Sequence, residues 1–62
     1  MAEVFPTDPK RIRERIRRYE RALKKDPAIA AALYNRALAL RKLQRTPEEI
    51  NAWKTYLAAY PD

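Results

Sequence analysis

Residues 27–61 read PAIAAALYNRALALRKLQRTPEEINAWKTYLAAYP, and this stretch decides the fold. The prolines at its two ends lie 34 residues apart, and the residues leading up to each proline match in type. The matching pairs are Glu14 with Glu48, Ile16 with Ile50, Tyr19 with Trp53, and Leu23 with Leu57. A period of about 34 residues is typical of helix-turn-helix repeats, which bury their apolar faces by stacking on neighbouring repeats. The sequence therefore predicts an all-α fold built from repeated helix pairs.

The first helix is predicted from residue 9 to about residue 24. Thr7 and Asp8 supply oxygens that can cap free N–H groups, and Pro9 fits the first helical position. Apolar residues recur at spacings of three and four, which places them on one stripe: Ile12, Ile16, Tyr19, Ala22 and Leu23. The opposite face of this helix is almost wholly Arg and Lys.

Two further helices are predicted, each after a similar start signal. Asp26 before a proline predicts a second helix over about 27–44, antiparallel to the first. Its apolar arc is too wide for one contact, as expected for a central helix touched by both others. Thr46 and Glu49 predict a capping box, in which Thr46 caps a third helix over about 46–60. The predicted architecture is a three-helix antiparallel bundle.

The small size of the chain limits how it can be stabilised. Its 62 residues form one domain, predicted over 9–62 after an N-terminal extension, residues 1–8, whose Val4 and Phe5 can fold back onto the helices. There is no Cys and no His, which removes disulfides and the commonest metal ligands. Helix packing or self-association then remains as the source of stability.

The sequence gives little sign of a membrane or export route. No apolar run approaches the roughly 20 residues that a membrane-spanning helix needs. The first residues lack the basic-then-apolar layout of a signal peptide. A cytoplasmic location is therefore the default expectation.

The segment from Ala30 to Pro61 resembles one tetratricopeptide repeat, a helix pair of 34 residues. The residues that match the pattern are Leu33, Ala37, Leu40, Trp53 and Pro61, and a preceding half repeat is matched by Tyr19, Ala22 and Pro27. The resemblance implies about one and a half repeats and a role in protein binding. A plain three-helix bundle with coincidental spacing remains the alternative.

Some positions depart from the family pattern. Arg36 stands where the family usually has leucine, and Tyr56 where it has alanine. Arg15 and Glu49 occupy the alanine position at which the two helices of a repeat come closest. Since the resemblance puts Arg36 and Glu49 in neighbouring turns, we expect these two side chains to form an ion pair.

The predicted core collects the apolar residues on the inward stripes of the three helices. Its members are Ile16, Tyr19, Leu23, Leu33, Ala37, Leu40, Ile50, Trp53 and Leu57. Tyr34, Leu38, Tyr56 and Tyr60 add more large side chains than three short helices can cover. Some apolar surface is therefore expected to face solvent.

Nothing in the sequence indicates catalysis. There is no His, Cys or Ser for a nucleophile pair, and no glycine-rich loop for a phosphate. Glu48 and Glu49 are adjacent, but carboxylates in a first helical turn are explained by the helix macrodipole. We expect no enzyme activity, no cofactor and no metal site.

The resemblance also implies a ligand surface on the second helix. In tetratricopeptide arrays the first helix of each repeat lines the groove, and the matching partner-binding residues here are Tyr34, Asn35, Leu38, Arg41 and Lys42. Asn35 with Arg41 or Lys42 resembles part of a grip on a peptide carboxylate. The alternative is that these residues bind no ligand and are solvated or covered by a neighbouring subunit.

The first helix is strongly basic. Residues 10–25 hold nine basic and two acidic side chains, in a chain of net charge +6. The exposed basic set is predicted to be Arg11, Arg13, Arg17, Arg18, Arg21 and Lys24. Such a face attracts polyanions, so binding of nucleic acid or of an acidic surface is the second functional hypothesis.

The function predicted first is a protein-interaction or assembly module. An array normally needs about three repeats with polar caps, and this chain has half that number. The expected partner is therefore a protein or peptide, with the chain acting as a homo-oligomer or as a piece of a longer array. A third hypothesis is an engineered minimal repeat without a native function, which the irregular departures from consensus disfavour.

Overall fold

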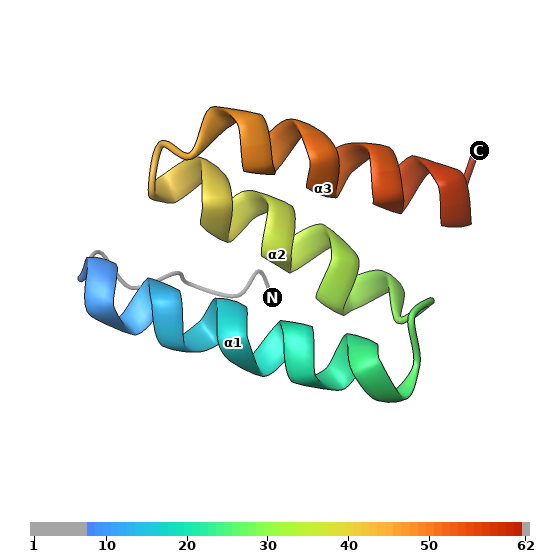
Figure 1. Ribbon diagram of the computed structural model, residues 1–62, viewed down its shortest axis with the longest axis horizontal. Helices are drawn as coiled ribbons and strands as arrows, with labels where there is room; N and C mark the ends of the chain where they lie inside the picture. The colour runs from blue at the N-terminus through green and yellow to red at the C-terminus, as the bar shows by residue number, and fades with distance from the viewer. Residues whose placement is uncertain (1–7, 62) are drawn as a thin grey trace.

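The computed structural model describes residues 8–61 of the chain. Three helices run antiparallel: α1 (Pro9–Lys25), α2 (Ala30–Lys42) and α3 (Thr46–Ala59) (Figure 1). α2 packs against both neighbours, whereas no Cα atom of α1 lies within 8 Å of one in α3. The predicted all-α three-helix bundle is confirmed, with α2 as its central helix. Because its outer helices do not pack on each other, the bundle is open.

α1 begins and ends where its sequence signals place it. The Asp8 carboxylate accepts a hydrogen bond from the backbone N–H of Lys10 at 3.0 Å, and Pro9 occupies the first helical position. The helix ends at Asp26, whose backbone is extended, with Lys24 and Lys25 in the last turn. Cations there offset the negative end of the helix macrodipole.

α2 begins at Ala30, so the prediction that it starts at Pro27 is wrong. The Asp26 carboxylate accepts from the N–H of Ala28 at 3.1 Å, which closes a turn over Pro27 and Ala28. The helix starts only after that turn, at an N-cap residue, Ile29, that has no side-chain hydrogen bond. The Asp-Pro pair therefore marks a turn here, as such pairs also do in loops.

α2 ends at Lys42, two residues earlier than predicted, because Gln44 adopts a left-handed conformation with φ of 58°. The N–H of Gln44 donates to the Arg41 carbonyl and that of Arg45 to the Leu40 carbonyl, both at 3.0 Å. These two bonds form a Schellman motif, which terminates a helix and satisfies its last carbonyls.

α3 lacks the capping box that the sequence predicts. Thr46 is the first helical residue rather than the cap, and the cap residue, Arg45, makes no side-chain capping bond. Glu49 does not reach back to the cap, because its carboxylate accepts from the indole N–H of Trp53 at 2.9 Å. Tertiary contacts of Glu49 thus replace the local capping bond.

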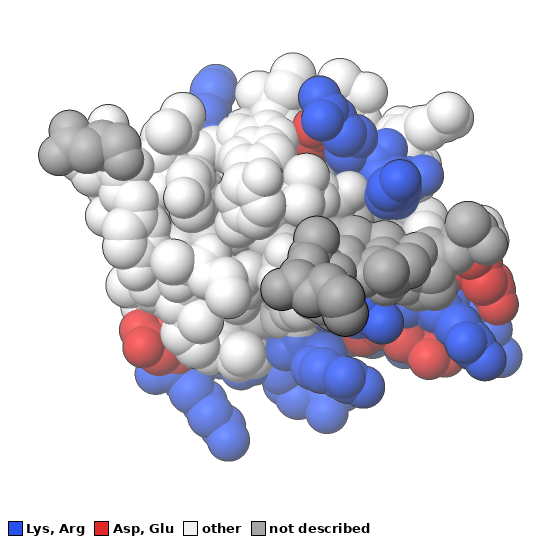
Figure 2. Space-filling view, turned by 180° about the vertical axis from the view of Figure 1, so that it is seen from behind, with Lys and Arg blue, Asp and Glu red and all other residues white. Residues whose placement is uncertain are grey.

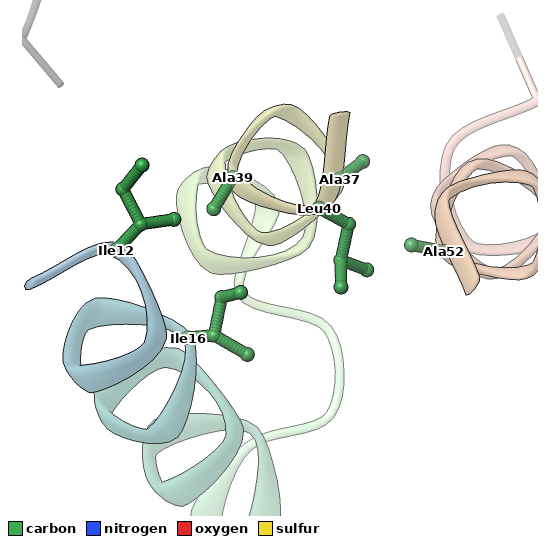
Figure 3. Close-up of a cluster of buried hydrophobic side chains, with 6 residues drawn as sticks. All are labelled: Ile12, Ile16, Ala37, Ala39, Leu40 and Ala52. Atoms are coloured by element: carbon green, nitrogen blue, oxygen red, sulfur yellow. The ribbon is translucent and has the colours of Figure 1, made fainter. Parts of the chain in front are cut away.

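The core lies along both sides of α2 (Figure 3). Its largest cluster combines Ile12 and Ile16 of α1 with Ala37, Ala39 and Leu40 of α2 and Ala52 of α3. Leu43 and Trp53 pack against it, and Ala32 and Leu33 are buried as well. Four of these ten side chains are alanines, which let the helix backbones approach closely. Three short helices can therefore share a core with few large residues.

The predicted core is only partly buried. Ile16, Leu33, Ala37 and Leu40 are buried, and Tyr19, Leu23 and Trp53 are half-buried. Placing Ile50 and Leu57 in the core is wrong, since they are 49% and 55% exposed. Ala52 occupies the position of α3 that faces the core. Ile50 and Leu57 therefore lie on the flank of the helix.

Parts of the prediction concern residues that the structure does not describe. The proposed N-terminal extension, including Val4 and Phe5, lies outside the described residues except for Asp8. Among residues 8–61, none of the helices combines the length and the apolar character required to span a lipid bilayer.

Candidate functional site

Four aromatic rings form a connected cluster on α2 and α3. Tyr34 of α2 meets Trp53 of α3 edge to face, with ring centroids 5.4 Å apart, and meets Tyr56 at 5.8 Å. Trp53 and Tyr56 are themselves 6.0 Å apart, and Tyr56 reaches Tyr60 at 5.7 Å. The contacts among Tyr34, Trp53 and Tyr56 are edge to face, a geometry that aromatic pairs prefer, and the Tyr56–Tyr60 pair is tilted. The four rings therefore pack on one another as one cluster.

This cluster is continuous with exposed aliphatic residues, and together they form what we call the aromatic face. Ile50, Trp53 and Leu57 follow one another at spacings of three and four, so they share one stripe of α3. Tyr34 is 45% exposed, close to the values for Ile50 and Leu57. Uncharged side chains gather over α2 and α3 in Figure 2, with Lys and Arg mainly at the margins of this area. The members of the aromatic face are Tyr34, Ile50, Trp53, Tyr56, Leu57 and Tyr60.

Polar contacts hold the aromatic face in place. The Glu49 carboxylate accepts from the Trp53 indole and lies 3.3 Å from Nε of Arg41 on α2. Glu49 is 14% exposed, so this ion pair is partly shielded from solvent on one side. At the other end, the Tyr60 hydroxyl donates to the Ala28 carbonyl and ties the end of α3 to the α1–α2 turn. The rings are thus fixed by hydrogen bonds as well as by packing.

The predicted partner-binding residues fall into two groups. Tyr34 belongs to the aromatic face, and Arg41 is engaged by Glu49. Asn35 and Leu38 are half-buried, and Lys42 is exposed in the last turn of α2. A carboxylate grip by this set stays a prediction. The ring cluster was not predicted, although the excess of tyrosines on α2 and α3 was its signal in the sequence.

A groove separate from the aromatic face lies between α1 and α3, over Leu40. Two adjoining cavities of about 210 and 240 Å³ share Glu20, Leu40 and Glu48 in their walls. Arg36 lines the first, and its Nε is buried without a hydrogen-bond partner. The predicted Arg36–Glu49 ion pair is wrong, because Glu49 pairs with Arg41 instead. The walls combine the guanidinium groups of Arg13, Arg17, Arg36 and Arg45 with the carboxylates of Glu20 and Glu48, so the groove is mixed in charge.

The predicted basic residues all lie exposed on α1. The same outward arc also holds Lys10 and Lys25, and we call the full set the basic face. The basic face consists of Lys10, Arg11, Arg13, Arg17, Arg18, Arg21, Lys24 and Lys25. Within the described residues, no group of three or more His, Cys, Asp or Glu side chains is placed to hold a metal ion.

Comparison with protein-family models, with curated proteins and with solved structures finds no match to this chain. The tetratricopeptide resemblance therefore rests on the residues of the sequence and stays a prediction. The candidate binding surfaces of the chain are the aromatic face and the basic face.

Proposed function

We propose that this chain is a protein-interaction and assembly module whose aromatic face binds a helix. The proposed partner is a helix of a second copy of the chain. The observation that carries the proposal is the exposure of Tyr34, Ile50 and Leu57 beside three further rings. Contiguous apolar surface of this kind marks interaction sites in soluble proteins. Tyrosine and tryptophan are also the side chains that most often dominate binding energy at interfaces.

The shape of the face suits a helix as the partner. α3 presents its apolar residues along one stripe, and Tyr34 of α2 lies beside that stripe. A second amphipathic helix can lay its own stripe against this pair of helices in the way neighbouring helices pack in a bundle. The resemblance to a repeat array supports the same geometry, since each repeat there is covered by the next helix.

The rigidity of the face lowers the cost of docking. Ordering a free side chain at an interface costs about 0.5–1.5 kcal/mol. Trp53 and Tyr60 are already fixed by their bonds to Glu49 and Ala28. Little further ordering is needed, so more of the apolar contact appears as binding energy.

The proposal is tested by sedimentation equilibrium over a wide concentration range. Leu57→Glu puts a charge within the aromatic face, and Thr55→Glu puts the same charge on an exposed residue of α3 outside it. We expect the molar mass of the parent chain and of Thr55→Glu to rise with concentration, and that of Leu57→Glu to stay at the monomer value. A parent chain that remains monomeric up to about 1 mM, equivalent to less than about 4 kcal/mol of association energy, contradicts self-docking.

A further inference from the structure

The basic face of α1 presents eight exposed cations over most of the outward half of one helix. Successive residues of a helix turn by about 100°, so these side chains span a single broad arc. Glu14 falls within the same arc, and Glu20 borders it beside Arg13 and Arg17. The helix has 17 residues, which gives the charged row a length of about 25 Å.

In the described part of the chain, no member of the basic face forms an ion pair. The pairs Arg41–Glu49 and Arg45–Glu48 use cations outside this face. The first turn of α1 holds no acidic residue but does hold Lys10 and Arg11, at the positive end of the helix macrodipole. Cations at that end weaken the isolated helix, whereas Lys24 and Lys25 in its last turn stabilise it.

Like charges also follow one another at the repulsive spacing. Arg13, Arg17 and Arg21 are four residues apart along α1, and like-charged pairs at this spacing cost about 0.2–0.5 kcal/mol each. A face whose role is solubility usually mixes both signs. A bound polyanion relieves the repulsion along this row.

We propose that the basic face of α1 binds the phosphate backbone of a nucleic-acid duplex, with α1 lying along a groove. Among the described residues, α1 packs only against α2, so its outward half stands free at one edge of the bundle (Figure 1). The major groove of B-form DNA is wide enough to admit an α-helix. Each phosphate contacted releases counterions, which supplies most of the binding energy in such complexes.

The same geometry argues against the two other polyanions. Helices that bind at a membrane surface bury an apolar face in it, and the apolar stripe of α1, with Ile12 and Ile16, is already buried against α2. Proteins that bind single strands stack bases on aromatic side chains. The aromatic residue of α1 is Tyr19, which is half-buried with its hydroxyl fully enclosed. A duplex is therefore the ligand that this surface fits.

The test measures binding of a short mixed-sequence DNA duplex by fluorescence anisotropy as a function of salt. If about four cations contact phosphates, the logarithm of the association constant falls against the logarithm of salt concentration with a slope of about −3.6. The triple variant Arg17→Gln, Arg21→Gln, Lys24→Gln should bind at least tenfold more weakly and lose about 2.7 from that slope. Circular dichroism of each variant checks that the helices remain formed.

A matched control carries the same change in net charge elsewhere. Lys42→Gln, Arg45→Gln, Lys54→Gln removes three exposed cations from α2, α3 and their connection, and should bind the duplex nearly as the parent does. Equal losses in the two triple variants would show a net-charge effect and overturn the proposal. It is also overturned by a lack of duplex binding at low salt, or by tighter binding to a single strand or to acidic lipid vesicles at the same salt.

This surface is independent of the aromatic face. Leu57→Glu adds one negative charge to the aromatic face, on a helix that does not pack on α1, and should bind the duplex nearly as the parent does. A chain that fails to self-associate but passes the duplex test leaves the present inference standing, and the reverse outcome leaves the docking proposal standing.

Discussion

Trp53 connects α2, α3 and the buried core. Its ring contacts Tyr34 and Tyr56, its indole N–H donates to Glu49, and it packs against the buried core cluster. Through Glu49 it is also linked to Arg41 of α2. The sequence predicts its structural role from the repeat spacing, but not its bond to Glu49, since nothing local distinguishes a capping glutamate from a tertiary acceptor.

Trp53→Ala is expected to lower the free energy of unfolding by about 3 kcal/mol, the lower end of the range for such truncations, because the side chain is half-buried. A domain of this size has a total stability of roughly 3–9 kcal/mol, so the variant should lose at least about a third of it and melt at a clearly lower temperature. Thermal melts followed by circular dichroism measure the change. Trp53→Phe keeps a ring and loses the hydrogen bond, and should cost about 1 kcal/mol. An unchanged melting midpoint for Trp53→Ala would place this residue outside the structural framework.

Removing the hydroxyl of Tyr60 and removing that of Tyr19 should change the free energy of unfolding differently. The Tyr60 hydroxyl donates to the Ala28 carbonyl, whereas that of Tyr19 is buried without a partner. Tyr60→Phe should therefore lower the free energy of unfolding by about 1 kcal/mol, and Tyr19→Phe should leave it unchanged or raise it by up to about 1 kcal/mol. Urea denaturation of both variants checks this, and a larger loss for Tyr19→Phe than for Tyr60→Phe would contradict the assigned contacts.

At the scale of the elements, the three helix starts show how far local signals reach. Pro9, Pro27 and Pro47 each follow a residue with a capping oxygen, yet of these residues only Asp8 caps the helix that follows. Asp26 closes a turn instead, and Thr46 lies inside α3. Helix existence and type were predictable because apolar spacing is averaged over a whole helix. Helix boundaries were not predictable, because one carboxylate can accept a hydrogen bond from any of several neighbouring N–H groups.

Substitution of the two presumed caps tests this difference. Asp8→Ala removes the bond to the Lys10 N–H and should cost about 1 kcal/mol of stability. Thr46→Ala removes a side chain without a capping bond and exchanges threonine for the best helix former, so it should cost nothing or stabilise slightly. Chemical denaturation of the two variants decides the matter. If Thr46→Ala lowers stability as much as Asp8→Ala does, Thr46 acts as a cap and the described start of α3 is wrong.

Burial on α3 was the part of the fold that the sequence predicted least well. Ile50 and Leu57 occupy the same apolar stripe as Trp53, but they face solvent because Ala52 takes the inward position. A periodic stripe shows that a face is apolar and does not show what covers it. Half of the aromatic face, Ile50, Trp53 and Leu57, therefore consists of residues that the sequence assigned to the core, whereas its three tyrosines were expected to exceed what the helices can cover.

At the scale of the whole molecule, the two functional surfaces lie on different elements and have different chemistry. The basic face belongs to α1, and the aromatic face to α2 and α3 (Figure 2). The central helix separates them, since α1 and α3 do not pack together. We propose that the first of these surfaces binds a polyanion and the second a protein helix.

This arrangement predicts opposite responses to salt. Self-association brings together two chains of charge +6 through an uncharged face, so added salt should strengthen it by screening their repulsion. Duplex binding releases counterions and should weaken with the same addition. Sedimentation and anisotropy at matched salt concentrations measure both. If the two responses have the same sign, the two surfaces do not act as assigned.

The central claim is that the aromatic face is the docking surface, and an NMR dilution series tests it most directly. The signals to follow are the indole N–H of Trp53 and the rings of Tyr34 and Tyr56, with backbone amides of α1 as the reference. We predict that the signals of the aromatic face shift with protein concentration while those of α1 stay constant. Constant signals from the aromatic face at every concentration, or shifts confined to α1, would contradict the account.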